Sequence, residues 1–182
     1  MAETTNLHGE GETRRDFLAL TAAAFGAVGV GFTGYAFVQS MNPAADTLAL
    51  STTEVDLTPV ALGQRITVKW QGSPVFIDHR TPQAIEEADK VAWKDLRDPQ
   101  PDSARVKPGK AEWLIVKGVC THLGCIPLGQ KPTDPRGEFD GWFCPCHGSQ
   151  YDTSGRIRKG PAPANLFVPP YVFLTDTSIK IG

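Results

Sequence analysis

The sequence contains few cysteines and no concentration of positive charge, and each shortage excludes a class of protein. Its 182 residues include 18 Lys and Arg against 20 Asp and Glu, with no visible basic face. The chain therefore lacks the electrostatic footprint of a nucleic-acid-binding protein. With 41% apolar residues it can form a core without relying on its four cysteines. Because these cysteines are clustered, they favour a metal site over a disulfide framework.

Charge is also missing from a long stretch near the N-terminus. No charged residue occurs from Phe17 to Val38, and a helix over this stretch would be about 33 Å long, enough to cross a bilayer core. The preceding residues 13–18 (Thr-Arg-Arg-Asp-Phe-Leu) look like a twin-arginine export motif. A cleaved signal peptide is the alternative, but its apolar region is only about 7–15 residues long. We expect residues 14–38 to be an uncleaved transmembrane anchor.

The charges that flank the apolar stretch predict its orientation. Arg14 and Arg15 precede it, and no Lys or Arg follows it before Arg65, so residues 1–13 are expected to stay in the cytoplasm as a tail. Residues 39–50 contain small residues and one proline, and when extended they could span about 35–40 Å. We expect a flexible hinge there, although a passive spacer fits the sequence equally well.

The remainder, residues 51–182, has the pattern of a β domain. Short β-rich runs with period-two alternation predict antiparallel strands. Thr81 and Pro82 are typical of an N-cap followed by the first helical residue, so a short helix is expected over residues 83–90. The expected strands cover residues 54–57, 65–70, 74–79, 112–117, 167–168, 171–175 and 178–181. The region that contains the cysteines is thus inserted between strands.

All four cysteines and two of the four histidines lie in two short stretches. Residues 120–125 read Cys-Thr-His-Leu-Gly-Cys, and residues 144–149 read Cys-Pro-Cys-His-Gly-Ser. Each stretch combines one Cys-His unit with an additional cysteine, in a loop rich in Gly and Pro, and this concentration of ligand types indicates the functional site. His8 and His79 are far from both stretches in sequence and are expected not to be ligands.

Three kinds of site compete on the residues alone. Structural zinc commonly takes two Cys and two His, but the stretches offer six candidate ligands for four positions. A thioredoxin-like redox pair requires Cys-x-x-Cys, whereas Cys144 and Cys146 are separated by one residue. An iron–sulfur cluster with mixed ligation uses one thiolate and one imidazole from each stretch. That third reading accounts for the spacing and leaves Cys125 and Cys146 outside the ligand set.

The two stretches resemble the cluster-binding loops of Rieske proteins, specifically those of cytochrome bc-type quinol oxidases. The resemblance extends to the anchor, the linker, residues 96–100 (Leu-Arg-Asp-Pro-Gln) and residues 154–163 (Ser-Gly-Arg-Ile-Arg-Lys-Gly-Pro-Ala-Pro). It implies a mainly β fold, an antiparallel β-sandwich Rieske domain with an inserted cluster-binding subdomain over residues 118–163. One N-terminal transmembrane helix would tether this domain.

The resemblance also implies the cofactor, one [2Fe–2S] cluster per chain. Cys120 and Cys144 would bind the inner iron, and His122 and His147 the outer one. A disulfide would join the two remaining cysteines, Cys125 and Cys146. Two neutral imidazoles in place of thiolates make such a cluster less negative, so its potential lies at about −150 to +300 mV, against about −400 mV for plant-type clusters.

Further roles follow from the resemblance for residues around the ligands. Ser149 would donate to a bridging sulfur and Tyr151 to a ligand cysteine, and both hydrogen bonds would raise the potential. His147 would face quinol and accept its proton, which predicts a midpoint potential that falls as pH rises. Leu123 and Gly124 would lie where the domain docks on cytochrome b. Pro161 would shield the cluster as part of a proline loop at residues 160–163.

We therefore expect a one-electron carrier subunit of a quinol:cytochrome c reductase. It would oxidise quinol beside cytochrome b and pass the electron to a membrane-bound c-type cytochrome, within a dimeric complex in the lipid of a bacterial inner membrane, with its β domain in the periplasm. The alternative is the Rieske subunit of another exported enzyme, such as an arsenite-oxidase-like one. Soluble oxygenase ferredoxins generally lack the extra cysteine pair, and a zinc module would be colourless instead of reddish-brown.

Overall fold

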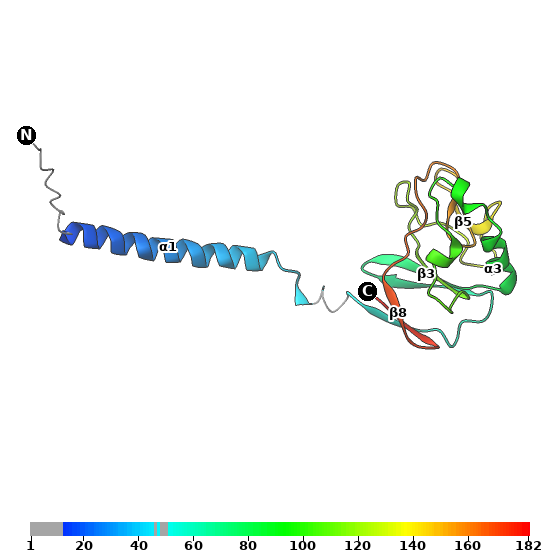
Figure 1. Cartoon of the computed structure of the whole chain (residues 1–182), viewed down its shortest axis with the longest axis horizontal. Coiled ribbons are helices and arrows are strands. Elements are labelled where there is room, and N and C mark those ends of the chain that lie inside the picture. Colours follow the sequence, from blue (N-terminus) through cyan, green and yellow to red (C-terminus); the bar gives the residue numbers. More distant parts are fainter. Residues whose placement is uncertain (1–12, 46, 48–50) are drawn as a thin grey trace, which may run out of the picture. The chain divides into compact units, whose positions relative to one another are not determined.

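The computed structural model describes residues 13–45, 47 and 51–182 (Figure 1). The chain divides into two units, Met1–Ala45 and Asp46–Gly182. Most of the expected cytoplasmic tail, with His8, lies outside the described residues, as do positions 46 and 48–50 of the expected hinge.

The first unit contains one long helix, α1, which spans Arg14–Ser40. Thr13 caps its N-terminus in a capping box, in which the Thr13 side chain accepts from the Asp16 amide and the Asp16 carboxylate accepts from the Thr13 amide. None of its residues is buried within the chain, and its most apolar stretch has a mean hydropathy of 1.7. The helix is about 40 Å long at 1.5 Å per residue. By length and composition it can cross a membrane.

In its described residues, the second unit has three antiparallel sheets of three strands each. The first sheet has the order β1-β9-β8, formed by Thr53–Asp56, Ser178–Ile181 and Tyr171–Thr175. The second has the order β2-β3-β4, formed by Arg65–Trp70, Ser73–His79 and Trp113–Lys117. The third has the order β5-β6-β7, formed by Asp140–Cys144, Ser149–Asp152 and Ile157–Lys159. Three short helices, α3 (Pro82–Asp89), η1 (Trp93–Asp95) and η2 (Asp102–Ala104), lie between β3 and β4 in sequence.

The middle sheet, β2-β3-β4, contributes side chains to two hydrophobic cores. Side chains alternate between the two faces of a strand, so Val75 and Ile77 of β3 enter one core while Phe76 between them enters the other. Strand β4 does the same, with Ile115 in the first core and Val116 in the second. Burial on both faces explains why these two strands read as continuous apolar runs.

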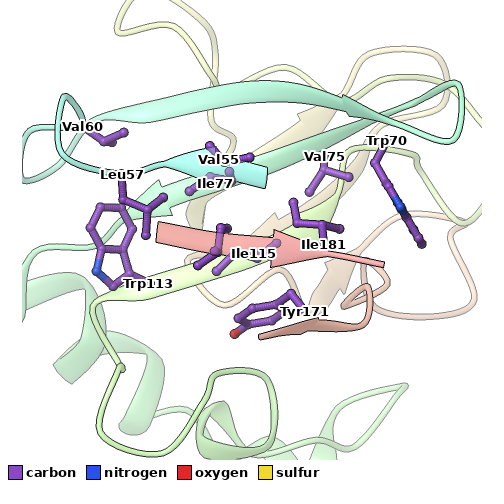
Figure 2. Packing of buried hydrophobic residues seen from close by; sticks show 11 residues of the cluster. Val55, Leu57, Val60, Trp70, Val75, Ile77, Trp113, Ile115, Tyr171 and Ile181 are labelled. Atoms are coloured by element: carbon purple, nitrogen blue, oxygen red, sulfur yellow. The ribbon is translucent and has the colours of Figure 1, made fainter. Parts of the chain in front are cut away.

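The first core lies between the middle sheet and the β1-β9-β8 sheet (Figure 2). Its buried members come from both sheets and from the loop after β1, and they are Val55, Leu57, Val60, Trp70, Val75, Ile77, Trp113, Ile115, Tyr171, Ile179 and Ile181. The second core joins the middle sheet to the β5-β6-β7 sheet through Phe76, Leu114, Val116, Trp142, Tyr151 and Ile157. The expected β-sandwich with an inserted subdomain is thus confirmed.

Most of the expected elements occur within one residue of their predicted bounds. The helix expected over residues 83–90 is α3, with Thr81 as its N-cap and Pro82 as its first residue. The strand expected at residues 167–168 is wrong. Pro169 and Pro170 follow it and have no amide proton to donate to a ladder, and Phe167 only accepts one bond, from the Lys117 amide. The strands β5, β6 and β7 were not predicted.

Candidate metal centre

A tight hairpin between β5 and β6 presents the second cysteine stretch. Cys144 ends β5 and Ser149 begins β6, and the two are register partners across the hairpin. The turn between them closes through a 3.0 Å hydrogen bond from the Gly148 amide to the Cys144 carbonyl. Gly148 has a φ of +76°, a conformation that glycine adopts without strain. The hairpin therefore places Cys144, Cys146 and His147 at one end of the sheet.

The first cysteine stretch is a loop that closes on itself after β4. The Cys120 amide donates to the Cys125 carbonyl at 2.7 Å, and the Gly124 amide donates to the Cys120 carbonyl at 2.9 Å. Gly124 has a φ of +83°, and its neighbour Leu123 is 71% exposed. Leu123 and Gly124, the expected docking residues, thus form the exposed tip of this loop.

The two loops are attached to each other in two ways. A disulfide joins Cys125 to Cys146, as the resemblance implied. Next to it, Leu128 and Phe143 exchange two backbone hydrogen bonds of 2.8 and 2.9 Å and thereby add a short bridge to the edge of β5. The loops are therefore held side by side by backbone contacts as well as by the disulfide.

The four candidate ligands occupy two environments. Cys120 and Cys144 are free thiols, each only 2% exposed. The His122 and His147 rings lie next to each other, with centroids 4.7 Å apart and planes at 86°, and His147 is exposed while His122 is half-buried. Two sulfur donors thus lie inside and two nitrogen donors lie toward the surface, one of each from either loop.

Ionisation of the two neighbouring thiols would require a bound cation. Burial raises the pKa of Cys120, but hydrogen bonds from the Tyr151 hydroxyl and the His122 amide outweigh burial and lower it overall. Burial raises the pKa of Cys144, and the adjacent Cys120 raises it further. Two neighbouring thiols do not both ionise at low cost without positive charge between them. This donor set therefore fits a metal cluster.

A second group of sulfur atoms does not make another site. The Sγ atoms of Cys125, Cys144 and Cys146 lie within 4.8 Å of one another. Two of these three are joined in the disulfide, so that only the Cys144 thiol remains as a donor.

Strand β6 carries both residues expected to tune the cluster. Ser149 and Tyr151 are two positions apart and so lie on the same face of the strand, and both are fully buried. The Tyr151 hydroxyl donates to Cys120 Sγ at 3.3 Å, and burial together with the Cys120 thiol raises the pKa of Tyr151. The Ser149 hydroxyl oxygen accepts from the Ala162 amide at 3.1 Å.

The proline loop, residues 160–163, packs directly on the second cysteine loop. A Cβ atom on Gly160 would lie 2.6 Å from the Ser149 Cα atom and 2.7 Å from the Gly148 carbonyl oxygen. Pro161 is exposed and Ala162 is completely buried. The expected shielding residue Pro161 thus borders the site.

The contacts that Thr121 and Arg97 make around the site were not predicted from the sequence. The Thr121 amide donates to the Tyr151 hydroxyl oxygen at 3.2 Å, and the Thr121 hydroxyl donates to the Ala164 carbonyl at 2.6 Å. Arg97 donates to two carbonyls of the proline loop. The position of Thr121 next to Cys120 is a signal for the first contact. His79, expected not to be a ligand, stacks on Trp113 of the first core with ring centroids 4.0 Å apart.

Two family models match the sequence. The first, Ubiquitinol-cytochrome C reductase Fe-S subunit TAT signal, matches residues 4–44, and the second, Rieske [2Fe-2S] domain, matches residues 80–171. The twin-arginine interpretation of the N-terminus is thus confirmed, as is the [2Fe–2S] cofactor.

Similar proteins match nearly the whole chain. The ubiquinol-cytochrome c reductase iron-sulfur subunit of Rhodospirillum rubrum is 60% identical over 179 residues, which is 98% of this chain and 97% of that protein. The protein of the same name from Rickettsia felis is 56% identical over 182 residues and all of both chains. A solved chain of a hyperthermophilic respiratory Complex III has a TM-score of 0.51 and 28% identity, and the match covers 88% of this chain and 98% of that one. The chain therefore belongs to the family of Rieske iron–sulfur subunits of ubiquinol–cytochrome c reductase.

Proposed function

We propose that this chain is the mobile one-electron carrier of a quinol:cytochrome c reductase, which accepts an electron from quinol beside cytochrome b and delivers it to a membrane-bound c-type cytochrome. The observation that carries the proposal is the arrangement of two buried thiols and two outward imidazoles on adjoining loops. No observation favours the arsenite-oxidase-like alternative, and the relatives that match along the whole chain are named as reductase subunits.

The ligands are assigned by burial and by the environment of each donor. Cys120 and Cys144, both buried, would bind the inner iron, while His122 and His147, nearer the surface, would bind the outer one. When bound, a [2Fe–2S] cluster with two imidazole ligands accepts one electron at a higher potential than an all-cysteine cluster does. The Cys125–Cys146 disulfide keeps both loops in the spacing that this ligand set requires.

Two hydroxyl groups on β6 would stabilise the additional negative charge of a reduced cluster. Tyr151 donates to Cys120 Sγ. The Ser149 oxygen accepts a hydrogen bond from the Ala162 amide, and this bond does not use the Ser149 hydroxyl proton, which remains for a cluster sulfur. Hydrogen bonds to ligand sulfur favour the reduced form and therefore raise the potential. The pair predicts the high-potential subtype of Rieske centre.

His147 is proposed as the contact for quinol. Its ring is exposed, and the apolar tip formed by Leu123 and Gly124 is the exposed end of the adjoining loop. The ring nitrogen that is not on the metal can accept a hydrogen bond from a quinol hydroxyl and take up its proton. Leu123 would pack against cytochrome b, and Pro161 would keep water from the other side of the site.

The anchor and the hinge position the β domain at the membrane. α1 is long and apolar enough to span a bilayer, and Arg14 and Arg15 at its start favour a cytoplasmic N-terminus. The β domain would then lie in the periplasm of a bacterial inner membrane, in a dimeric complex surrounded by lipid. Residues 39–50 would be the hinge over which the β domain moves between its two redox partners.

The test is an EPR titration of the membrane-bound protein with and without a quinol-site inhibitor. The proposal predicts the spectrum of a reduced mixed-ligand [2Fe–2S] centre at a high midpoint potential, with a line shape that changes when the inhibitor is added. A protein without this signal, or one whose spectrum and potential do not respond to any quinol-site ligand, contradicts the proposal.

A further inference from the structure

Arg97 forms hydrogen bonds to the proline loop although it lies far from that loop in sequence. Its Nη1 atom donates to the Gly160 and Ala162 carbonyls, both at 2.6 Å. Arg97 is an exposed residue, and its side chain forms no ion pair within the described part of the chain. The two carbonyls are therefore its polar partners, and they fix the backbone on either side of Pro161.

The segment held by Arg97 lies directly on Ser149. The contact between Gly160 and the Gly148–Ser149 backbone is so close that a Cβ atom on Gly160 would lie 2.6 Å from the Ser149 Cα atom. The Ala162 amide then donates to Ser149 Oγ at 3.1 Å. Ala162 and Ser149 are both fully buried, so no water molecule from the surface replaces this bond.

A hydroxyl group that accepts from a backbone amide is restricted in rotation. An amide can only donate, so the Ser149 oxygen must accept in this bond and its own proton must point elsewhere. We propose that Arg97 is a positioning residue for the cluster: by holding the Gly160 and Ala162 carbonyls it keeps the Ala162 amide on Ser149 Oγ and so leaves the Ser149 proton for the cluster. The inference rests on the tuning role proposed for Ser149 above.

A positive charge near a redox centre also raises its potential without any hydrogen-bond relay, so the test has to separate the two causes. A double-mutant cycle does so, because it measures the coupling between two side chains. The variants are Arg97→Gln, Ser149→Ala and the combination, each assembled with its cluster in the complex. The measured quantity is the midpoint potential, obtained by redox titration with EPR detection. Arg136→Gln is the matched control, since it removes a partly exposed arginine that is 3.8 Å from its partner Asp140.

We expect Arg97→Gln to lower the midpoint potential by part of the shift that Ser149→Ala causes, and to change the EPR line shape. In the Ser149→Ala background the same substitution is expected to have no further effect, while Arg136→Gln leaves the potential as it is. A shift from Arg97→Gln that persists undiminished in the Ser149→Ala background overturns the relay, because it then arises from charge. A potential equal to that of the Arg136→Gln control overturns it as well.

Two further variants and one further readout keep the outcomes distinct. If Arg97→Gln does not retain the cluster, Arg97→Lys replaces it in the same cycle, since lysine keeps the charge and lacks the planar guanidinium. Hydrogen exchange of the Gly160, Ala162 and Ala164 amides is expected to accelerate in either variant. If Ser149→Ala itself leaves the potential unchanged, the tuning role of Ser149 fails. If only Arg97→Gln leaves it unchanged, the relay alone fails.

Discussion

At the scale of single residues, the direction of the Tyr151 hydrogen bond follows from a neighbour that can only donate. The Thr121 amide donates to the Tyr151 oxygen at 3.2 Å, while the Thr121 hydroxyl gives its proton to the Ala164 carbonyl. The Tyr151 hydroxyl in turn donates to Cys120 Sγ, 3.3 Å away. The Thr121 hydroxyl oxygen also lies 3.3 Å from the Tyr151 oxygen, so the backbone and the side chain of Thr121 together hold the Tyr151 hydroxyl beside the sulfur.

Replacing Tyr151 by phenylalanine is expected to lower the midpoint potential. A hydrogen bond is worth about 1 kcal/mol net, which for one electron corresponds to about 40 mV. Redox titration with EPR detection measures the shift. Tyr171→Phe is the matched control, because Tyr171 is also buried but belongs to the other core. An unchanged potential in Tyr151→Phe, or an equal shift in the control, contradicts the assignment.

Tyr171 predicts a pH dependence of stability at alkaline pH. Burial raises its pKa to about 12, and its hydroxyl makes no well-formed hydrogen bond to the described residues. The folded state thus retains the Tyr171 proton, which the unfolded state loses from about pH 10 upward. The contribution of this proton to the free energy of unfolding is fully present below pH 10 and is lost between pH 10 and 12. Relative to the wild type, Tyr171→Phe is expected to gain up to roughly 2–3 kcal/mol across this window.

Denaturant unfolding of the wild type and Tyr171→Phe at pH 8, 10, 11 and 12 measures this difference. At pH 8 the variant should be at least as stable as the wild type, because a buried hydroxyl without a well-formed hydrogen bond costs free energy. A constant difference from pH 8 to 12 would show that the Tyr171 hydroxyl does not titrate with folding.

The residues with chemistry were largely predictable, but their supports were not. The proposed ligands and Ser149 fall in two contiguous motifs, Tyr151 follows two residues after the second, and the family resemblance implies a role for each. Arg97 contacts carbonyls 63 and 65 residues further along the chain. A backbone carbonyl has no side-chain signature, so no sequence pattern marks which arginine will bind it.

At the scale of elements, Arg65 attaches strand β2 to the cluster subdomain. Its Nε atom pairs with Asp78 at 2.9 Å, and its Nη1 atom donates to the Gly129 and Gly141 carbonyls at 2.9 and 2.7 Å. The guanidinium also lies 4.4 Å from the centroid of the Trp142 ring. A buried cation thus adds to the second core in connecting the sheet that holds Cys144 to the β-sandwich.

Arg65→Met is expected to cost about 3–5 kcal/mol of folding free energy, because it leaves the Asp78 carboxylate buried without its partner. The double variant Arg65→Met/Asp78→Asn removes both charges and should recover part of this loss. Lys159→Gln is the control, since its pair with Glu138 is exposed on both sides and is worth at most about 1 kcal/mol. Equal losses in Arg65→Met and Lys159→Gln would refute the connecting role.

The elements of the sandwich were predictable and those of the subdomain were not. Alternation marks β2, which packs on one face, and continuous apolar runs mark β3 and β4, which pack on both faces. Strands β5, β6 and β7 have three to five residues each and lie among Gly, Pro and Cys, which weaken any strand signal. Conversely, residues 167–168 are apolar but are followed by two prolines, so they form no strand with a ladder of backbone hydrogen bonds.

At the scale of the whole molecule, the proposed function requires a segment that moves between two fixed ends. α1 continues to Ser40, with Met41 as its cap. On the other side, Ser51 is attached to the β domain, because its carbonyl accepts from the Trp70 indole at 2.7 Å. Asn42 is also attached to the helix, since its amide donates to the Gln39 carbonyl at 3.1 Å, so these contacts narrow the proposed hinge to the residues between Asn42 and Ser51.

Stiffening this segment should slow electron transfer without affecting the cluster. We expect a variant with prolines at positions 44, 45 and 47 to have a turnover well below that of the wild type, since proline restricts its own φ and the preceding residue. A variant with glycine at the same positions is the control and should retain turnover. The EPR spectrum should be the same in all three proteins. Full turnover in the proline variant, with intact cluster, would contradict the mobile role.

The central claim is that two imidazoles and two thiolates hold the cluster, and pulsed EPR of the reduced protein labelled with ¹⁵N-histidine tests it most directly. The account predicts couplings from two histidine nitrogens, and it predicts that the signal is lost or altered in His122→Cys and His147→Cys but unchanged in His79→Gln. A spectrum with no histidine nitrogen coupled to the cluster, or one altered by His79→Gln alone, would contradict it.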